Sequence, residues 1–392
     1  MHLSRRNVLL LSCCQALLLT NAVTLVAING LAGFALSSNK AFATLPNMSY
    51  VLGTAIATFP ASLWMKRVGR RNGFLTGGVF GLAGSALAAY AVATGSMPLL
   101  CAGTLILGGY NAFGQYYRFA AADSASPEFK SRAISYVLAG GIVGGIVGPE
   151  LSKHTRGLWN PDYAASYASL FAICLLAMTV MSFLRIPPPA ESVSSERARR
   201  LGRIVAQPVF VVAAGVAALG YAVMNLLMTA TPLAMGFCGL PYSSAASVIS
   251  AHAVAMFGPS FFTGSLIRRF GALHVMLAGV AAQLACVAIG LSGQLFQNFW
   301  WALVLLGLGW NFMYIGGTTL LTEAYRPSEH AKAQGANEIL IFTVQAISSL
   351  SSGVLVNTRG WDTLNFVALP FILIAGAAVL WLSWKRASLA PA

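Results

Sequence analysis

The run GGYNAFGQYYRFAAADSASPEFKSRA, residues 108–133, has a counterpart 200 positions later in LGWNFMYIGGTTLLTEAYRPSEHAKA, residues 308–333. Chemically matched residues recur in the two runs at this constant offset: Asn111 with Asn311, Asp123 with Glu323, Pro127 with Pro327, and Arg132 with Lys332. A second pair of segments, SLWMKRVGRRNGFL and GSLIRRFGALHVM, places Gly69 and Gly271 202 positions apart. Because the register barely drifts between the two pairs, we predict that the chain contains two copies of one structural unit.

The composition predicts that a lipid bilayer surrounds most of the chain. Of 392 residues, 57% are hydrophobic and 9% are charged, whereas about 25% of residues in a soluble domain are charged. Apolar windows of about 20 residues, the length that crosses the hydrocarbon core, recur from end to end. Twelve such windows are expected, at 8–31, 47–65, 74–93, 97–121, 133–152, 164–185, 208–234, 245–267, 273–293, 298–322, 335–356 and 364–384. The expected fold is therefore an all-α integral membrane protein with 12 transmembrane helices.

Lysine and arginine are concentrated on one side of the predicted membrane. With the N-terminus in the cytoplasm, nineteen of the 24 cations fall on cytoplasmic segments, and four fall on outer segments. Cytoplasmic segments are enriched in these residues near the ends of spans. We therefore expect both termini in the cytoplasm, a multi-pass location in the cell inner membrane, and contact of the basic loops with membrane lipid. The net charge of +14 is explained by this topology. The sequence has no basic segment rich in aromatic residues of the kind that would indicate nucleic-acid binding.

Each repeated unit contains an even number of predicted spans, so both units cross the membrane in the same orientation. This arrangement predicts two parallel halves related by a pseudo-twofold axis along the membrane normal. The expected boundaries are 1–186 for the N-terminal six-helix half, 187–207 for a cytoplasmic linker rich in Pro and Arg, and 208–392 for the C-terminal six-helix half.

The architecture and one loop motif resemble the major facilitator superfamily. In that family the loop between spans two and three runs Gly-x-Leu-x-Asp-Arg-x-Gly-Arg-Arg, and KRVGRR at residues 66–71 retains its end. The second half retains four of the motif positions: Gly264, Leu266, Arg269 and Gly271. Both halves depart from the motif at the aspartate, which is Lys66 in one half and Arg268 in the other. The resemblance implies a secondary transporter, and it implies that the aspartate's usual contribution to the cytoplasmic gate comes from other residues.

Two acids are the expected replacement partners for the basic loops. Asp123 and Glu323 lie at the inner ends of predicted spans four and ten. We predict charge pairs between these acids and the basic loops that break as the cytoplasmic gate opens. The alternative is solvated surface charge without a gating role. The residues assigned to this gate are Lys66, Arg70, Asp123, Arg132, Arg268, Glu323 and Lys332.

The fifth predicted span contains GGIVGGIVGPE, residues 140–150. Gly144 and the pair Gly148–Pro149 match part of a fifth-helix motif that is often found in the family's proton-driven exporters. The glycines that should follow are replaced by Glu150 and Leu151. Glycines four residues apart also let two helices approach closely, and we expect packing at the interface between the halves.

In the fold of the major facilitator superfamily, which this sequence resembles, spans one, four, seven and ten line a central cavity. Polar side chains are costly in hydrocarbon, so those on these spans should face the cavity or each other. The predicted substrate-binding residues are Asn21, Asn111, Gln115, Arg118, Tyr221, Asn225, Trp310 and Asn311. Arg118 is the most specific candidate among them. Its counterpart in the second half is the uncharged Thr318, so the charge is not a structural feature that both halves share. Its guanidinium could contact the solute, pair with Asp123, or extend to the inner surface.

Proton coupling requires a titratable group in the solute path, and residues 1–122 contain no Asp or Glu. His252, in predicted span eight, can relay protons near neutral pH or fill a hydrogen-bonded structural role. Glu338, near the start of predicted span eleven, is either a buried carboxylic acid or a favourable negative charge at a helix start. If neither residue carries protons, the protein is expected to be a facilitator without coupling.

Other kinds of chemistry find little support in the sequence. The six cysteines form no CxxC pair, and the five histidines are not clustered with other metal-ligating residues. No Gly-x-x-x-x-Gly-Lys-Ser/Thr nucleotide-binding loop occurs in the chain. We therefore expect no enzyme activity, no metal and no cofactor.

The combined prediction is a secondary active or facilitative transporter that moves a small organic solute by alternating access and works as a monomer. Aromatic and amide side chains around a single arginine suit a neutral or anionic aromatic heterocycle, and a flavin-like vitamin taken up by the cell is the concrete hypothesis. Coupling to protons stays open. The alternative is proton-driven export of a drug or metabolite, which the Gly-Pro sequence of span five favours and the acid-free first span disfavours. A membrane receptor without transport activity and a membrane-embedded enzyme are further alternatives.

Overall fold

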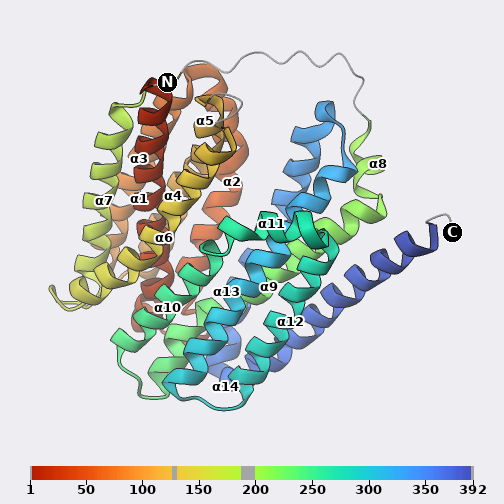
Figure 1. The fold of residues 1–392 in the computed structure, drawn as a ribbon. Helices are drawn as coiled ribbons and strands as arrows, with labels where there is room; N and C mark the ends of the chain where they lie inside the picture. The colour runs from red at the N-terminus through yellow and green to blue at the C-terminus, as the bar shows by residue number, and fades with distance from the viewer. Residues whose placement is uncertain (1, 126–129, 187–198, 390–392) are drawn as a thin grey trace.

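A computed structural model describes residues 2–125, 130–186 and 199–389, and within these ranges the chain is helical with no strand. The first group of helices consists of α1 (His2–Leu36), η1 (Lys40–Phe42), α2 (Leu45–Val68), α3 (Arg70–Ala93), α4 (Met97–Gly114), α5 (Tyr117–Asp123), α6 (Lys130–Thr155) and α7 (Ala164–Ser182). The second group consists of α8 (Leu201–Val205), α9 (Pro208–Phe237), α10 (Tyr242–Phe257), α11 (Ser260–Phe270), α12 (Ala272–Leu291), α13 (Phe296–Leu321), η2 (Thr322–Ala324), η3 (Pro327–Glu329) and α14 (His330–Leu389). Figure 1 shows the two groups side by side.

The described residues contain nine helical segments that are long and apolar enough to cross a membrane, and ten when the bent pair α10–α11 is counted as one span. The all-α membrane fold is thus confirmed, whereas the number twelve stays a prediction. The last two expected windows both fall within α14, which is interrupted at Gly360 by a non-helical backbone with φ 82° and ψ 179°. The window at 47–65 forms α2, a helix of 24 residues, which is not among the nine. The predicted linker falls largely on 187–198, outside the described residues.

Two predicted spans are broken rather than continuous. The window 97–121 is divided between α4, which ends at Gly114, and α5, which begins at Tyr117. The window 245–267 is divided between α10 and α11, whose axes differ by 42°. Proline lacks a backbone N–H and clashes with the preceding turn of a helix, so Pro259 accounts for the second break. At the first break, Gln115 lies just after the end of α4, and Arg118 is the second residue of α5.

The two glycines of the repeated basic loops share one backbone geometry. Gly69 has φ 84° and ψ 161°, and Gly271 has φ 84° and ψ 154°. Only glycine adopts this region without strain. Each residue ends one helix and starts the next, α2 to α3 and α11 to α12. The sequence repeat therefore marks the same sharp helix–helix turn twice.

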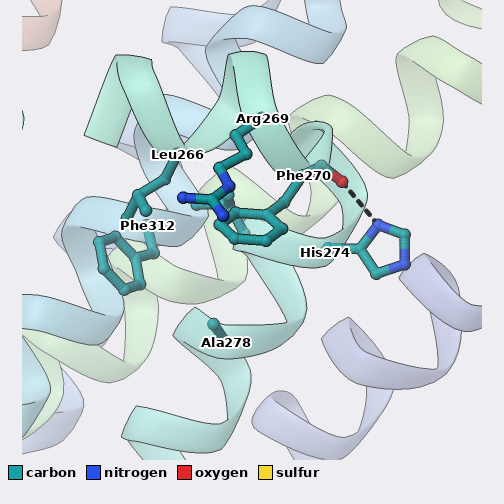
Figure 2. A pocket seen from close by; sticks show the side chains of 7 residues that line it. Leu266, Arg269, Phe270, His274, Ala278 and Phe312 are labelled. Carbon is teal, nitrogen blue, oxygen red and sulfur yellow. Dashed lines mark hydrogen bonds between the residues drawn. The ribbon is translucent and has the colours of Figure 1, made fainter. Parts of the chain in front are cut away.

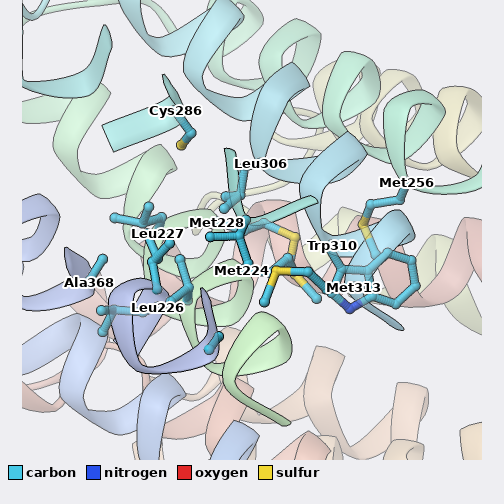
Figure 3. Close-up of a cluster of buried hydrophobic side chains, with 14 of the residues drawn as sticks. Met224, Leu226, Leu227, Met228, Met256, Cys286, Leu306, Trp310, Met313 and Ala368 are labelled. Atoms are coloured by element: carbon cyan, nitrogen blue, oxygen red, sulfur yellow. The ribbon is translucent and has the colours of Figure 1, made fainter. Parts of the chain in front are cut away.

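The interior of the second group is organised around α9. All but three residues between Val212 and Met235 are buried. Figure 3 shows side chains of this helix interleaved with those of its neighbours, with methionines filling the spaces around an indole ring: Met224, Met228, Met256, Met313 and Trp310. Flexible thioether side chains fill irregular gaps between helices well. The outer surface carries exposed apolar side chains such as Leu373, Leu380 and Trp384.

The glycine-rich span forms α6 and packs on two neighbours. A Cβ atom added at Gly140, Gly144 or Gly148 would overlap the backbone carbonyl of Ser12, Ala16 or Thr20 on α1, respectively. Gly145 faces the second group instead, because a Cβ added there would lie 2.7 Å from the Cβ of Ala253 on α10. The expected contact between the halves thus involves Gly145, while Gly144 and Gly148 pack within the first group.

Candidate functional site

The two helix groups meet through neutral hydrogen bonds near η1. The amide nitrogen of Asn47 donates to the hydroxyl of Ser349 at 2.9 Å and to the hydroxyl of Thr229 at 3.2 Å. The hydroxyl of Thr44, at the start of α2, donates to the backbone carbonyl of Ser349 at 2.7 Å. A Cβ atom added at Gly353 would overlap Thr44 Oγ1, so α14 lies as close to α2 as glycine allows. We call this contact region the closed end.

A second contact at the closed end joins α6 and α10. The hydroxyls of Ser152 and Tyr242 share a hydrogen bond of 2.6 Å. The guanidinium carbon of Arg156 lies 5.1 Å from the ring centre of Tyr242 and 5.2 Å from that of Tyr163. The same guanidinium donates to Asp162 at 3.2 Å. A cation held over two aromatic rings is a favourable arrangement, and here it spans both groups.

Away from the closed end, a cavity of about 560 Å³ separates the two groups. This volume lies in the range of about 300–1,000 Å³ that is usual for small-molecule sites. Its walls come from α2, from Arg70 at the start of α3, from α5 with the two residues before it, and from α14. The lining residues are Ala55, Thr58, Phe59, Ser62, Arg70, Gln115, Tyr116, Arg118, Phe119, Asp123, Gln334, Gly335, Glu338, Ile339, Phe342 and Thr343.

Arg118 and Glu338 line this cavity from different helix groups. Arg118 lies on α5 and Glu338 on α14. The guanidinium carbon of Arg118 is 4.9 Å from the ring centre of Phe119, and its Nε is buried without a hydrogen-bond partner within the described part of the chain. The ion pairs found among the described residues include neither side chain. The predicted pairing of Arg118 with Asp123 is not made in this conformation.

Among the described residues, each of the two predicted gating acids pairs with one cation. Asp123 accepts from Arg70 of the first basic loop, with Oδ2 and Nη2 3.1 Å apart. Glu323 pairs with Arg386 near the end of α14 at 2.6 Å, rather than with the second basic loop. Arg268 of that loop donates to Ser265 at 2.8 Å, and Lys66 and Lys332 are exposed. The side chain of Arg132 lies outside the described residues.

Four of the predicted substrate-binding residues are asparagines that bond to neighbouring helices. Asn21 donates to Cys174 Sγ at 3.3 Å, and Asn225 donates to the carbonyl of Gln345 at 2.8 Å. Asn111 donates to Thr54 on α2 at 3.3 Å. Asn311 donates to the Met256 carbonyl at 2.6 Å and to Ser260 at 2.8 Å, and accepts from Thr263 at 2.7 Å. None of the four lines the cavity as described.

The two predicted aromatic residues, Tyr221 and Trp310, form a cluster with Tyr314. Trp310 stacks on Tyr314 with ring centres 5.1 Å apart and planes 13° apart. Tyr221 meets the edges of both rings at 5.0 and 5.1 Å. None of these three rings lines the cavity, whereas Gln115 and Arg118 do.

The two candidate proton carriers are placed differently. His252 is 1% exposed, and its Nδ1 lies 2.7 Å from the carbonyl of Leu303. It thus bridges α10 and α13 inside the second group. Glu338 is half-buried and lines the cavity, where a solute could reach it.

One well-bonded acid had no role in the sequence-based prediction. Glu329 is fully buried and accepts from Arg199 twice, Nε to Oε1 at 2.7 Å and Nη2 to Oε2 at 2.7 Å. The backbone N–H groups of Arg199 and Arg326 also donate to it. These hydrogen bonds, those from Arg199 above all, hold the pKa of the Glu329 carboxyl well below its ordinary value. At the offset of 200 the counterpart of Glu329 is Phe129. The internal repeat therefore gave no indication that Glu329 is a buried, hydrogen-bonded acid.

A second hollow, of about 490 Å³, lies on α11, α12 and α13. Figure 2 shows Arg269 beside the ring of Phe270 and His274 bonded to the Phe270 carbonyl. Its walls all come from the second group, and none of the predicted substrate-binding residues lines it. The cavity between the groups is therefore the stronger candidate for a solute site.

Comparison with known proteins agrees with the fold. The model of the Major Facilitator Superfamily matches residues 8–314 and 216–392. The chain is 39% identical over 375 residues to the riboflavin transporter RfnT of Brucella anthropi, covering 95% of this chain and 94% of that protein. It is 29% identical to the uncharacterized MFS-type transporter YddS of Bacillus subtilis, covering 86% of this chain and 82% of that protein.

Two solved structures share the fold at low sequence identity. A bacterial homolog of the human lysosomal transporter Spinster, in an inward-facing and unoccupied conformation, superposes with a TM-score of 0.73 at 15% identity and 99% coverage of both chains. The nucleoside transporter NupG, solved as a point mutant, gives 0.72 at 14% identity, covering 95% of this chain and 99% of that one. The predicted resemblance is confirmed: the chain belongs to the major facilitator superfamily and is a multi-pass membrane transporter of a small solute, not an enzyme.

Proposed function

We propose that this transporter takes up riboflavin, or a flavin closely related to it, across the bacterial inner membrane. The observation that carries the proposal is the 39% identity to a riboflavin transporter along 95% of the chain. The aligned region covers 95% of the chain and so extends over both helix groups. The flavin-like heterocycle inferred from the sequence points to the same class of solute.

The chemistry of the cavity suits such a solute. A flavin has a flat aromatic ring system with a polar edge and a hydroxylated ribityl chain. Tyr116, Phe119 and Phe342 offer aromatic faces, and Gln115 and Gln334 offer amides. Small-molecule sites typically combine apolar and aromatic walls with a few polar groups that orient the ligand.

The conformation fits one stage of alternating access. The groups touch at the closed end through Asn47, Ser349 and Thr44, and the cavity lies toward Arg70 and Asp123. Under the predicted topology, which places the basic loops in the cytoplasm, the cavity faces inward. Uptake then requires the closed end to open so that the solute can enter from outside.

The test is growth and uptake in a bacterium that cannot make riboflavin and lacks its own riboflavin transporter. Expression of this protein should restore growth on low riboflavin and accumulation of radiolabelled riboflavin. Arg118→Ala should lower uptake about tenfold or more, because a charge-assisted contact in a water-poor site contributes about 1.5–3 kcal/mol. Arg203→Ala, which changes an exposed arginine of α8, is the control and should retain uptake.

Two results would overturn the proposal. One is no uptake although the protein is present in the membrane. The other is a loss of riboflavin from cells that express the protein, which would support export instead. Repeating the assay with a protonophore would show whether uptake depends on a proton gradient.

A further inference from the structure

We propose that Arg118 and Glu338 act together to recognise a cyclic imide. The guanidinium donates to a ring carbonyl, and the carboxyl group accepts the neighbouring ring N–H. This inference rests on the proposed function, because it specifies the part of the flavin that forms hydrogen bonds with the cavity residues. The chemical class it specifies is a neutral heterocycle with an N–H between two carbonyls.

The first step in the argument is that the cavity holds one cation and one acid without ionic partners. Arg70 and Asp123 also line the cavity, but they pair with each other at 3.1 Å. Arg118 and Glu338 belong to no ion pair among the described residues, and Arg118 Nε has no hydrogen-bond partner there. Charged groups in a membrane interior are retained where they contact substrate, ions or each other. A solute between them would satisfy both.

The second step is that the two groups differ in hydrogen-bonding chemistry. A guanidinium has N–H donors and no acceptor, whereas a carboxylate only accepts. The imide edge of a flavin presents an acceptor, a donor and an acceptor in a row. Arginine alone would leave the N–H unpaired, and glutamate alone would leave the carbonyls unpaired. Together they match two adjacent positions of this edge, and Gln115 in the same wall can supply an amide donor to the third.

The third step concerns the orientation of the ring. Arg118 is held over Phe119 at 4.9 Å, and the hydroxyl of Tyr116 donates to the Thr58 carbonyl at 3.0 Å. These contacts limit the motion of the guanidinium and of the tyrosine ring beside it. Tyr116 and Phe342 line the same cavity as Arg118 and Glu338, so the cavity offers a flat ring aromatic faces as well as the two charged groups. Imide recognition thus uses residues of both helix groups.

The fourth step is a balance of charge. The cavity lining contains two arginines, Arg70 and Arg118, and two acids, Asp123 and Glu338. Their formal charges cancel, so no surplus cation is available for a phosphate group. Burying an uncompensated anion is strongly unfavourable. The pair is therefore expected to favour riboflavin over its phosphate ester, and this narrows the neutral or anionic heterocycle of the sequence-based prediction to a neutral one.

The experiment compares riboflavin with N3-methylriboflavin, which lacks the imide N–H and is otherwise the same. Binding to purified protein is measured by the quenching of flavin fluorescence. The natural protein should bind riboflavin about tenfold to a hundredfold more tightly, because the methyl group leaves a buried acceptor without its donor. Glu338→Ala should bind riboflavin more weakly and lose most of this discrimination. Glu338→Gln, which keeps an acceptor oxygen, should retain more of it.

Controls separate recognition from folding. Ile347→Ala changes a lipid-exposed side chain on the same helix and should leave both affinities unchanged. All variants are compared by thermal unfolding, so that a loss of folded protein is not mistaken for a loss of recognition. Arg118→Lys keeps a cation but removes the fork of donors, and it should weaken riboflavin and N3-methylriboflavin by similar factors.

The outcomes distinguish this inference from the proposed function. Riboflavin uptake with equal affinity for the N3-methyl compound would refute imide recognition and leave riboflavin transport intact. Binding of uridine, a cyclic imide without the flavin ring system, that depends on Glu338 while riboflavin is not transported would support imide recognition and refute the proposed function. Equal affinity for riboflavin and its phosphate ester would refute the charge balance.

Discussion

The side-chain amide of Asn47 on α2 donates to the hydroxyl of Ser349 on α14 at 2.9 Å, and both residues are buried. The same amide also reaches Thr229 on α9 at 3.2 Å. One short side chain therefore ties the first helix group to two helices of the second. These are neutral hydrogen bonds, each contributing about 0.5–1.5 kcal/mol, so they can break and re-form as the groups move.

Ser349→Ala should shift the population toward the conformation in which the closed end is open. Loss of one hydrogen bond, about 1 kcal/mol, changes the ratio of two conformations about fivefold. We would measure the labelling of a cysteine placed at Gln115, in protein with the exposed Cys13 replaced, by an impermeant thiol reagent applied to each side of the membrane. Labelling from the cytoplasmic side should fall. Ser247→Ala, at an exposed site on α10, should not change this labelling. Unchanged labelling in Ser349→Ala would show that the Ser349 hydrogen bond does not stabilise the closed end.

Gly353→Ala should impair closure of the same end. The added Cβ would overlap Thr44 Oγ1 and lie 2.9 Å from Thr44 Cγ2, so α2 and α14 would have to separate. Uptake should fall about tenfold or more while the amount of protein in the membrane stays similar, an estimate that takes overpacking to cost about 1–3 kcal/mol.

The matched control is Gly215→Ala on α9, where an added Cβ meets nothing within 4 Å. That variant should transport normally. Thr44→Ala combined with Gly353→Ala should recover part of the lost uptake, because it removes the hydroxyl that clashes. Normal uptake by Gly353→Ala alone would show that the closed end tolerates the wider spacing.

Glu329→Gln should lower the thermal unfolding temperature at neutral pH and weaken its dependence on pH. Hydrogen bonds from Arg199 lower the pKa of Glu329 in the folded protein, whereas an unfolded glutamate titrates near pH 4.3. The stabilisation is thus present above about pH 4.3 and is lost as the pH falls toward the folded pKa. Natural protein should lose stability on acidification below about pH 5 more steeply than the variant. Glu150→Gln, which breaks an exposed pair with Lys153 at 3.4 Å, should have little effect.

Asn311→Ala should destabilise the protein by about 2–3 kcal/mol, because it removes three hydrogen bonds at one buried site and takes the side-chain donor away from the Met256 carbonyl. These bonds hold α13 against the break between α10 and α11. Denaturant unfolding in detergent would give the value. Asn111→Ala removes a single bond of 3.3 Å to Thr54 and should cost less than half as much. Equal costs would contradict the assignment of Asn311 as the anchor of the bent pair.

The internal repeat predicted local geometry better than it predicted the solute site. Gly69 and Gly271, 202 positions apart, turn the chain with the same φ. Asn111 and Asn311 each donate to a helix two spans earlier in the chain, α2 at Thr54 and α10 at Met256, and these two acceptors are also 202 positions apart. Matched residues at a fixed offset report matched helix contacts, and such contacts are local in each half.

The solute site was harder to predict because hydropathy does not say which way a polar side chain points. An asparagine inside hydrocarbon is satisfied equally well by a cavity or by a neighbouring helix, and Asn21, Asn225 and Asn311 bond to neighbours. Charge was a better guide to the cavity, since Arg118 lines it and belongs to none of the ion pairs among the described residues. Helix breaks were missed at Pro259 and between Gly114 and Tyr117, because hydropathy windows record composition and not direction.

The hydrogen bonds that join α2 to α9 and α14 at the closed end are neutral, and this has a consequence for how the protein responds to dissolved salt. Asn47, Ser349, Thr44 and Thr229 join the two groups there without an ion pair between them. Dissolved salt weakens attraction between exposed charges over a distance of about 10 Å at 0.1 M, but it has little effect on buried neutral hydrogen bonds. Under the proposed topology this seal faces the surroundings, where salinity varies, whereas the Arg70–Asp123 pair faces the regulated cytoplasm. The balance between the two orientations should therefore change little when a bacterium moves between fresh and brackish water.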